Sequence, residues 1–160
     1  MGYESTLYIG ELYGPEPEYR DDPSKPHDDG SGYAYLRDSN GNPVTTNRVL
    51  RYLSSFARIE MCKLGYDSAI LKLVDDSRRS MPDYEVPYIF GTDGNTRIKE
   101  DCYGSRLIPV RLEALLRAVY LDLEREHYRR LYWLKALIEG VLAHYDGNDR
   151  CDLVALHYGH

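Results

Sequence analysis

A cluster of basic and aromatic side chains lies in the last third of the sequence. In chain order it comprises Arg125, Tyr128, Arg129, Arg130, Tyr132, Trp133 and Lys135. Arg125 and Arg129 are four residues apart, so on a helix they would be neighbours, with Tyr128 and Tyr132 close by on the same cylinder. Arginine, tyrosine and tryptophan dominate protein interfaces, and they also pair with phosphates or stack on bases. The cluster therefore predicts a binding surface.

A second candidate surface is acidic and lies between residues 14 and 32. This segment has four prolines, three glycines and no periodic apolar pattern, which is typical of a loop. Its paired carboxylates are Asp21, Asp22, Asp28 and Asp29. Such a loop could imitate nucleic acid on a partner protein. A competing interpretation pairs these acids with the arginines near the C-terminus, leaving the aromatic residues at the edge of the core.

The sequence holds no recognisable catalytic or cofactor motif. It has no glycine-rich phosphate loop, no Gly-x-Ser-x-Gly, no Cys-x-x-Cys and no His-Glu-x-x-His. Cys102 follows Glu100 and Asp101, whose negative charges disfavour the thiolate that a nucleophile needs, so we expect Cys102 to be a small buried or half-buried residue. These observations argue against an enzyme, and we predict no catalytic residue and no cofactor.

Potential metal ligands are sparse. Cys151, His157 and His160, with His144 across a turn, are the nearest approach to a metal site. In a straight strand Cys151 and His157 would lie roughly 20 Å apart, which is too far for one ion. We therefore predict no metal site.

Composition favours a binding protein. Sixteen tyrosines accompany only two phenylalanines in 160 residues, and tyrosine gives an amphipathic contact surface at low entropic cost. The net charge of −6 argues against general nucleic-acid binding. No apolar run approaches the ~20 residues needed to span a bilayer, and three widely spaced cysteines fit reduced thiols. We expect a single intracellular domain, residues 1–160, with no membrane association and a loop insertion at about 14–32.

The first half of the chain predicts short strands. Residues 6–13 form a β-rich run, and 33–37 form a second strand before a turn at 39–43. Thr46 or Asn47 would cap a short helix through Leu53. Residues 56–64 alternate like a strand with Ile59 and Met61 on one face, and Gly65 ends it.

The second half predicts helices between strands. The segment 68–74 suits a strand or a helix, and Asp67-Ser68 favours the helix. Val86 to Phe90 and Thr96 to Glu100 should pair as a hairpin around Gly91–Asn95. One helix follows Pro109, a second spans about 127–145 until Asp146-Gly147-Asn148, and 151–158 returns as a strand. Leu123–Glu126 allows the helices to fold back or to continue as one. The order predicts an α+β fold, a mostly antiparallel sheet with two late helices packed on it.

Several blocks of sequence resemble a group of small uncharacterised proteins carried by phages and prophages, chiefly of Gram-positive bacteria. The blocks, which also occur in matching order, are 57–63, 93–104, 128–130 and 153–159. The resemblance covers residues 1–12 and about 56–160, whereas 14–50 looks like an addition. It carries no known reaction. It implies a phage accessory protein, a population in which inhibitors of bacterial immunity, including anti-CRISPR proteins, are common.

Two functional hypotheses of different classes follow. In the first, the chain is a phage-encoded accessory protein of the bacterial cytoplasm that binds a defence protein or ribonucleoprotein stoichiometrically, through the acidic loop or the Arg–Tyr helix. In the second, Arg129, Arg130 and Tyr132 sequester or help to degrade a nucleotide signal. A virion-assembly accessory is a further alternative. An exposed apolar stripe on the last helix would indicate a homodimer.

Overall fold

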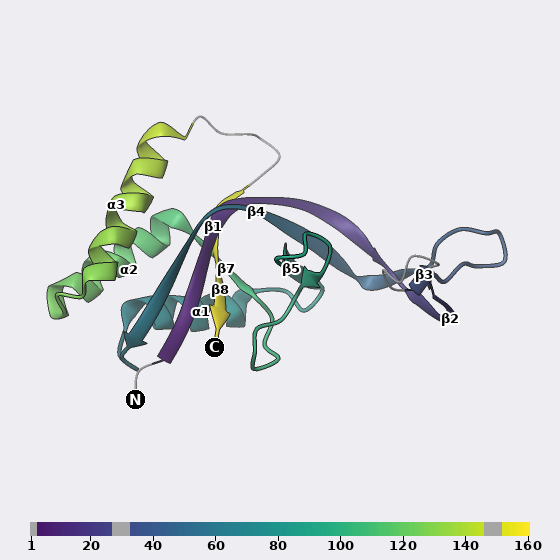
Figure 1. Cartoon of the computed structure of the whole chain (residues 1–160), viewed down its shortest axis with the longest axis horizontal. Coiled ribbons are helices and arrows are strands. Elements are labelled where there is room, and N and C mark those ends of the chain that lie inside the picture. Colours follow the sequence, from purple (N-terminus) through teal and green to yellow (C-terminus); the bar gives the residue numbers. More distant parts are fainter. Residues whose placement is uncertain (1–2, 27–32, 146–151) are drawn as a thin grey trace.

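The centre of the molecule is a six-stranded sheet in the order β6-β5-β4-β1-β8-β7 (Figure 1). The computed structural model describes residues 3–26, 33–145 and 152–160. The strands of this sheet are β1 (Tyr3–Tyr19), β4 (Thr45–Leu64), β5 (Glu85–Phe90), β6 (Arg97–Ile98), β7 (Ile108–Arg111) and β8 (Asp152–Gly159). All neighbours pair antiparallel except β4 and β5, which are parallel.

Three helices complete the body: α1 (Ala69–Ser80), α2 (Leu112–Arg125) and α3 (Arg129–His144). Their apolar faces join Leu7, Ile9 and Met61 from the sheet in the largest buried cluster. α2 ends at Arg125 and α3 packs back against it, so the fold-back alternative is correct. The chain is thus an α+β protein with a mostly antiparallel sheet and two late helices packed on it, as predicted.

The predictions that rest on short-range signals, a helix cap and two glycine turns, were confirmed. Ser68 caps α1 by accepting a hydrogen bond from the Leu71 backbone N–H. β5 and β6 pair around a turn in which Gly94 has a φ of +74°, and Gly41 occupies the turn at 39–43 with a φ of +81°. The C-terminal strand is present as β8. The predicted stop at residues 146–148 lies outside the described residues.

A bulge in β4 changes which side chains of the strand point to each face of the sheet. Ile9 pairs with Ala57, but Gly10 pairs with Ser55, so Phe56 is an extra residue on β4. Because side chains alternate between the faces of a strand, one extra residue reverses the faces that follow it. Ile59 and Met61 accordingly lie on one face, as predicted, and pack in the main cluster with the helices. Leu53 instead joins a smaller cluster that also contains Leu12.

Two predictions for the N-terminal half were wrong. The described part of the expected loop at 14–32 is extended: Gly14 to Tyr19 continue β1, and residues 21–26 form β2 (Asp21–Pro26), which pairs with β3 (Tyr33–Tyr35). β8 pairs with β1 only as far as Leu12. Beyond it β1 has a free edge, where prolines are tolerated. The expected helix after Thr46 is part of β4, because Val49, Leu50 and Tyr52 pair with both β1 and β5.

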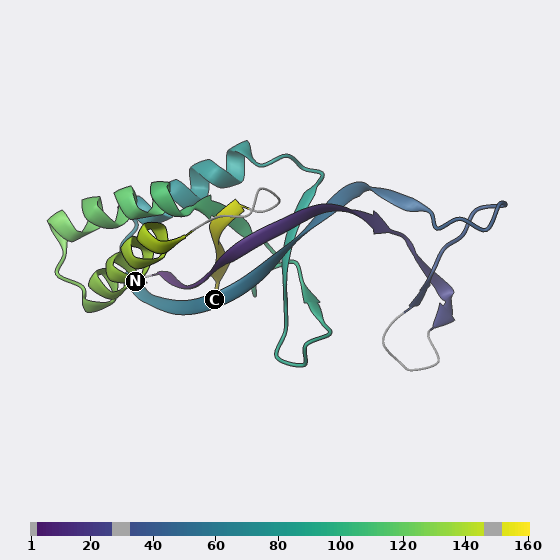
Figure 2. The ribbon, with the colours of Figure 1, turned by 90° about the horizontal axis from the view of Figure 1, so that it is seen from above.

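These extended segments form a projection that we call the arm, residues 14–26 and 33–48. Figures 1 and 2 show it leaving the body as a curved ribbon, on the side of the sheet away from α2 and α3. Pro109, predicted at a helix start, lies in β7 opposite Leu156, and the helix begins three residues later. None of the helices in the described ranges has both the length and the apolar character needed to cross a membrane.

A buried histidine in β8 makes the fold sensitive to acid. His157 is 2% exposed. Burial, reinforced by the positive charges of Arg78 and His160 and only partly opposed by Asp101 and Asp75, lowers its pKa to about 4. The folded state therefore holds His157 neutral while the unfolded chain takes up a proton below about pH 6.5. Stability should be complete above that pH and should decline towards pH 4.

We expect the free energy of unfolding to fall by about 2 kcal/mol between pH 7.5 and pH 5. Urea unfolding at several pH values measures this change. His157→Gln keeps a polar side chain that cannot titrate, so its pH dependence over this window should be nearly flat. An equally steep decline in that variant would assign the acid sensitivity to other groups.

Candidate partner-binding surface

The predicted Arg–Tyr cluster is largely occupied in holding the body together. The Arg125 guanidinium pairs with the carboxylate of Asp67 and donates to its carbonyl at 3.1 Å. The hydrogen bond from Arg125 lowers the pKa of Asp67. Arg130 donates to the carbonyl of Glu60 at 2.6 Å. These two arginines fasten α2 and α3 to the end of β4 and the segment after it.

The remaining members of the cluster are divided. Tyr128 precedes α3 and packs, half-buried, against the main core. Tyr132 is exposed, with its hydroxyl 3.0 Å from Nδ1 of His127. Arg129 and Trp133 are also exposed, and Trp133 is the more open of the two aromatic residues at 55%. The start of α3 therefore offers a narrower surface than the sequence predicted.

The proposed pairing between these arginines and the acidic segment is wrong. Arg125 takes its carboxylate from Asp67 instead. The arm lies at the far end of the molecule from α2 and α3 in both ribbon views (Figures 1 and 2). The two candidate surfaces therefore cannot form one continuous site.

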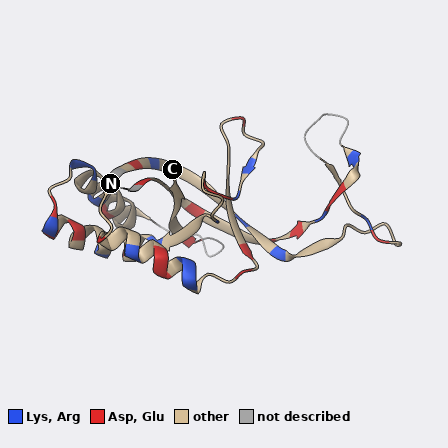
Figure 3. Cartoon of the chain, turned by 90° about the horizontal axis from the view of Figure 1, so that it is seen from below, with Lys and Arg blue, Asp and Glu red and all other residues tan. Residues whose placement is uncertain are grey.

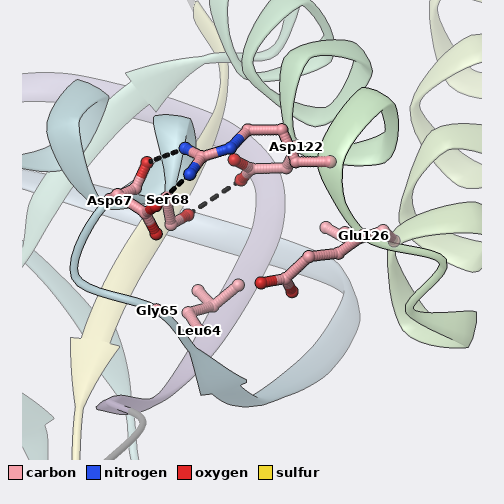
Figure 4. A pocket seen from close by; sticks show the side chains of 8 residues that line it. Leu64, Gly65, Asp67, Ser68, Asp122 and Glu126 are labelled. Atoms are coloured by element: carbon pink, nitrogen blue, oxygen red, sulfur yellow. Dashed lines mark hydrogen bonds and ion pairs between the residues drawn. The ribbon is translucent and has the colours of Figure 1, made fainter.

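A small pocket beside Arg125 is a structural centre. Figure 4 shows Asp122 of α2 directed at the start of α1. The buried Asp122 carboxylate accepts hydrogen bonds from Ser68 Oγ at 2.8 Å, from the Ala69 N–H at 2.7 Å and from the Ile70 N–H at 3.3 Å. An aspartate at a helix N-terminus accepts hydrogen bonds from otherwise unpaired N–H groups, and its negative charge interacts favourably with the positive end of the helix dipole. With a volume of about 10 Å³, the pocket has room for no more than a water molecule.

The arm ends in a junction of three backbone segments. The Arg20 N–H donates to the carbonyl of Val44, Leu36 N–H donates to Arg20, and Val44 N–H donates to Leu36, each at 2.8 Å. From this junction the β2–β3 hairpin leaves in one direction and the 37–43 hairpin in the other. Backbone hydrogen bonds thus define the tip without an apolar core.

The side chains at this tip are aromatic and open. Tyr33 is 48% exposed and Tyr35 is 41% exposed, with Tyr19 and Leu36 each at 36%. The rings of Tyr19 and Tyr35 lie 5.0 Å apart across the strands. Sequence reasoning identified the tyrosine excess but not this group, because only the pairing of β2 with β3 brings its members together.

The acidic residues of the arm are mixed with basic ones rather than gathered on one face (Figure 3). Asp22 accepts hydrogen bonds from the N–H and Oγ of Ser24, which lower its pKa. Asp21 is exposed in β2, and Asp28 and Asp29 lie outside the described residues. The described acids therefore give the arm little of the uniform negative charge of a nucleic-acid backbone.

The remaining candidates from the sequence are Cys102 and the potential metal ligands. Cys102 is exposed, so its predicted burial was wrong. Asp101, buried beside it, accepts the Tyr103 and Ser105 N–H groups at 2.9 Å each and organises a turn that points Cys102 outwards. Within 3–26, 33–145 and 152–160, no group of three potential ligands could hold a metal ion; Cys151 falls outside these ranges.

Comparison with known proteins finds no matching family model, no matching curated protein and no matching solved structure.

Proposed function

We propose that this protein acts by stoichiometric binding to a partner protein and that the arm is its docking element. One observation carries the proposal. The described residues of the arm contribute no buried apolar side chain to any core, yet they expose three tyrosines and a leucine together at the tip. Interface hot spots are enriched in tyrosine, and a rigid ring pays little entropy on binding.

The construction of the arm supports the same conclusion. A two-stranded ribbon without a packed face is marginally stable in water. Here the ribbon continues strands that are fixed in the central sheet, which orders its base without covering its tip. A partner that closes over Tyr19, Tyr33 and Tyr35 would remove apolar surface from water at a site that the fold leaves open.

The partner class comes from the resemblance to phage and prophage accessory proteins. On that basis the partner is a bacterial defence protein or ribonucleoprotein in the cytoplasm of the host cell, and the protein is an inhibitor of anti-CRISPR type. The mixed charge of the arm favours contact with the protein component over imitation of nucleic acid. The nucleotide hypothesis at Arg129, Arg130 and Tyr132 is weaker, because Arg130 is engaged by the Glu60 carbonyl.

Affinity capture tests the proposal. The tagged protein is incubated with lysate of a bacterium that carries active defence systems, with and without nuclease, and retained proteins are identified by mass spectrometry. We expect one stoichiometric defence component, and expression of the protein should restore phage plating on that host. Retention of virion proteins only, or assembly of the purified chain into large oligomers, would support the assembly alternative instead.

A pair of double variants tests the role of the arm. Tyr33→Ser/Tyr35→Ser removes the most exposed rings of the tip, and Tyr66→Ser/Tyr103→Ser removes two rings of the body that are 81% and 64% exposed. We expect the arm variant to bind the captured partner at least about a hundredfold more weakly, since two hot-spot tyrosines contribute about 2 kcal/mol each. The body variant should bind like the parent. Equal affinities of the two variants would remove the arm from the interface.

A further inference from the structure

A basic cleft lies between Arg48, where the arm joins the body, and the β5–β6 hairpin. It has a volume of about 360 Å³ and its cations are Arg48 of β4, Arg97 of β6, Lys99 and Arg106. Val86 of β5 lines it as an apolar wall, and Glu100 is the one acid among its lining residues. Cations from separate segments therefore converge on one hollow in a chain whose net charge is −6.

Two of the cations are positioned by a buried carboxylate. Glu18 of β1 is 5% exposed and accepts hydrogen bonds from Arg48 at 3.0 Å and from Lys99 at 2.9 Å. Burial alone would raise the pKa of Glu18, but the bonds and charges of Lys99 and Arg48 outweigh burial and lower it. Glu18 thus stays ionised and orders both cations at the rim of the cleft.

The other two cations are also held in place. Arg106 donates to the carbonyls of Pro82 at 2.8 Å and Glu85 at 3.1 Å. The Arg97 guanidinium lies 5.2 Å from the centre of the Tyr88 ring, a cation–π arrangement that orients the group without neutralising it. Among the described residues, Arg97 forms no ion pair. Asp83 lies 3.9 Å from the Arg106 guanidinium. Counting Glu18, Glu100 and Asp83 against the four cations leaves a net charge of +1 at the cleft.

We propose that this cleft binds a small ligand that carries two or more adjacent phosphate groups. Ligand sites usually enclose about 300–1,000 Å³, so the cleft suits a small molecule better than a polypeptide. Arginine presents several N–H donors in a planar fork that matches phosphate oxygens. A diphosphate carries negative charge on two adjacent groups, so it can pair with cations that come from separate segments of the chain. This site is independent of the arm's docking surface, so either proposal can fail without the other.

Calorimetric titration of the purified protein with inorganic pyrophosphate, and separately with a nucleoside triphosphate, tests the site. We expect saturable binding of one ligand per chain. Arg97→Gln should weaken it about tenfold, the loss of one charge-assisted hydrogen bond, and Arg97→Glu should weaken it about a hundredfold. Because Arg97 is exposed, both variants should keep the parent's thermal transition. Tighter binding of the triphosphate than of pyrophosphate would identify a nucleotide as the ligand.

Arg111→Gln is the matched control, since Arg111 is an exposed arginine of β7 at the opposite edge of the sheet. Its affinity for pyrophosphate should equal that of the parent. The proposal is overturned if neither phosphate ligand binds at millimolar concentration, or if Arg111→Gln weakens binding as much as Arg97→Gln. It is also overturned if a hexaglutamate peptide binds as tightly as pyrophosphate, because the cleft would then recognise an acidic polypeptide.

Discussion

Replacing Gly10 by alanine is expected to lower the free energy of unfolding by about 3 kcal/mol or more. A Cβ atom at this position would lie 2.1 Å from the carbonyl oxygen of Ser54 and 2.7 Å from the Cα of Ser55. Both are backbone atoms of β4 at the bulge, so no side chain can move aside to relieve the contact. The ribbon would have to separate where β1 and β4 pass from one buried cluster to the other.

Equilibrium unfolding in urea measures this effect. Gly140→Ala is the control, because nothing lies within 4 Å of a Cβ built on Gly140, which lies in the last two turns of α3. That substitution should stabilise the protein by up to about 1 kcal/mol through the higher helix propensity of alanine. If the free energy of unfolding of Gly10→Ala were within about 1 kcal/mol of that of the parent, the two strands could not approach each other this closely at the bulge.

Asp122→Ala is expected to cost about 3 kcal/mol of unfolding free energy. Its carboxylate accepts the Ser68 hydroxyl and the first two N–H groups of α1, all in a buried environment. Alanine would leave these donors without their acceptor and would remove the link between α1 and α2. Asp122→Asn keeps an acceptor oxygen but loses the charge, so its cost should be intermediate.

The matched control for Asp122 is Asp76→Ala in α1, where the carboxylate is exposed and only 3.6 Å from the Arg79 guanidinium. Exposed pairs of this kind contribute little, so the change should stay within about 0.5 kcal/mol. Similar losses for Asp122→Ala and Asp76→Ala would show that the buried network does not stabilise the junction.

Sequence predicted the elements whose causes are local. Ser68 indicated the start of α1, because a helix cap acts over only three residues. Gly94 indicated its hairpin, because the turn needs a residue with a positive φ. The arm was missed for the opposite reason. Its prolines and acids have loop composition. Only pairing with residues of β4 that are 26 to 34 positions away, from Tyr19 with Thr45 to Glu16 with Leu50, makes this segment a strand.

The position of the proposed docking surface could not be predicted from the sequence. The excess of tyrosine indicated contact surface, but which rings stay open depends on the strand pairing that joins Tyr33 to the tip. Helical spacing predicted Arg125 and Arg129 as neighbours on one helix, but Arg125 ends α2 and Arg129 begins α3. Spacing also could not show that Asp67 and the Glu60 carbonyl would occupy the arginines of this region. Glu18 had no distinguishing signal, because its partners Arg48 and Lys99 are 30 and 81 residues away.

A hydrogen-exchange footprint of the protein with its captured partner locates the docking element. If the arm is the docking element, amides of the tip, including those of Arg20, Leu36 and Val44, should exchange more slowly in the complex, while α3 stays unchanged. Protection confined to the start of α3, around Arg129 and Tyr132, with an unaffected arm, would rule out docking through the arm and place the interface on the helix.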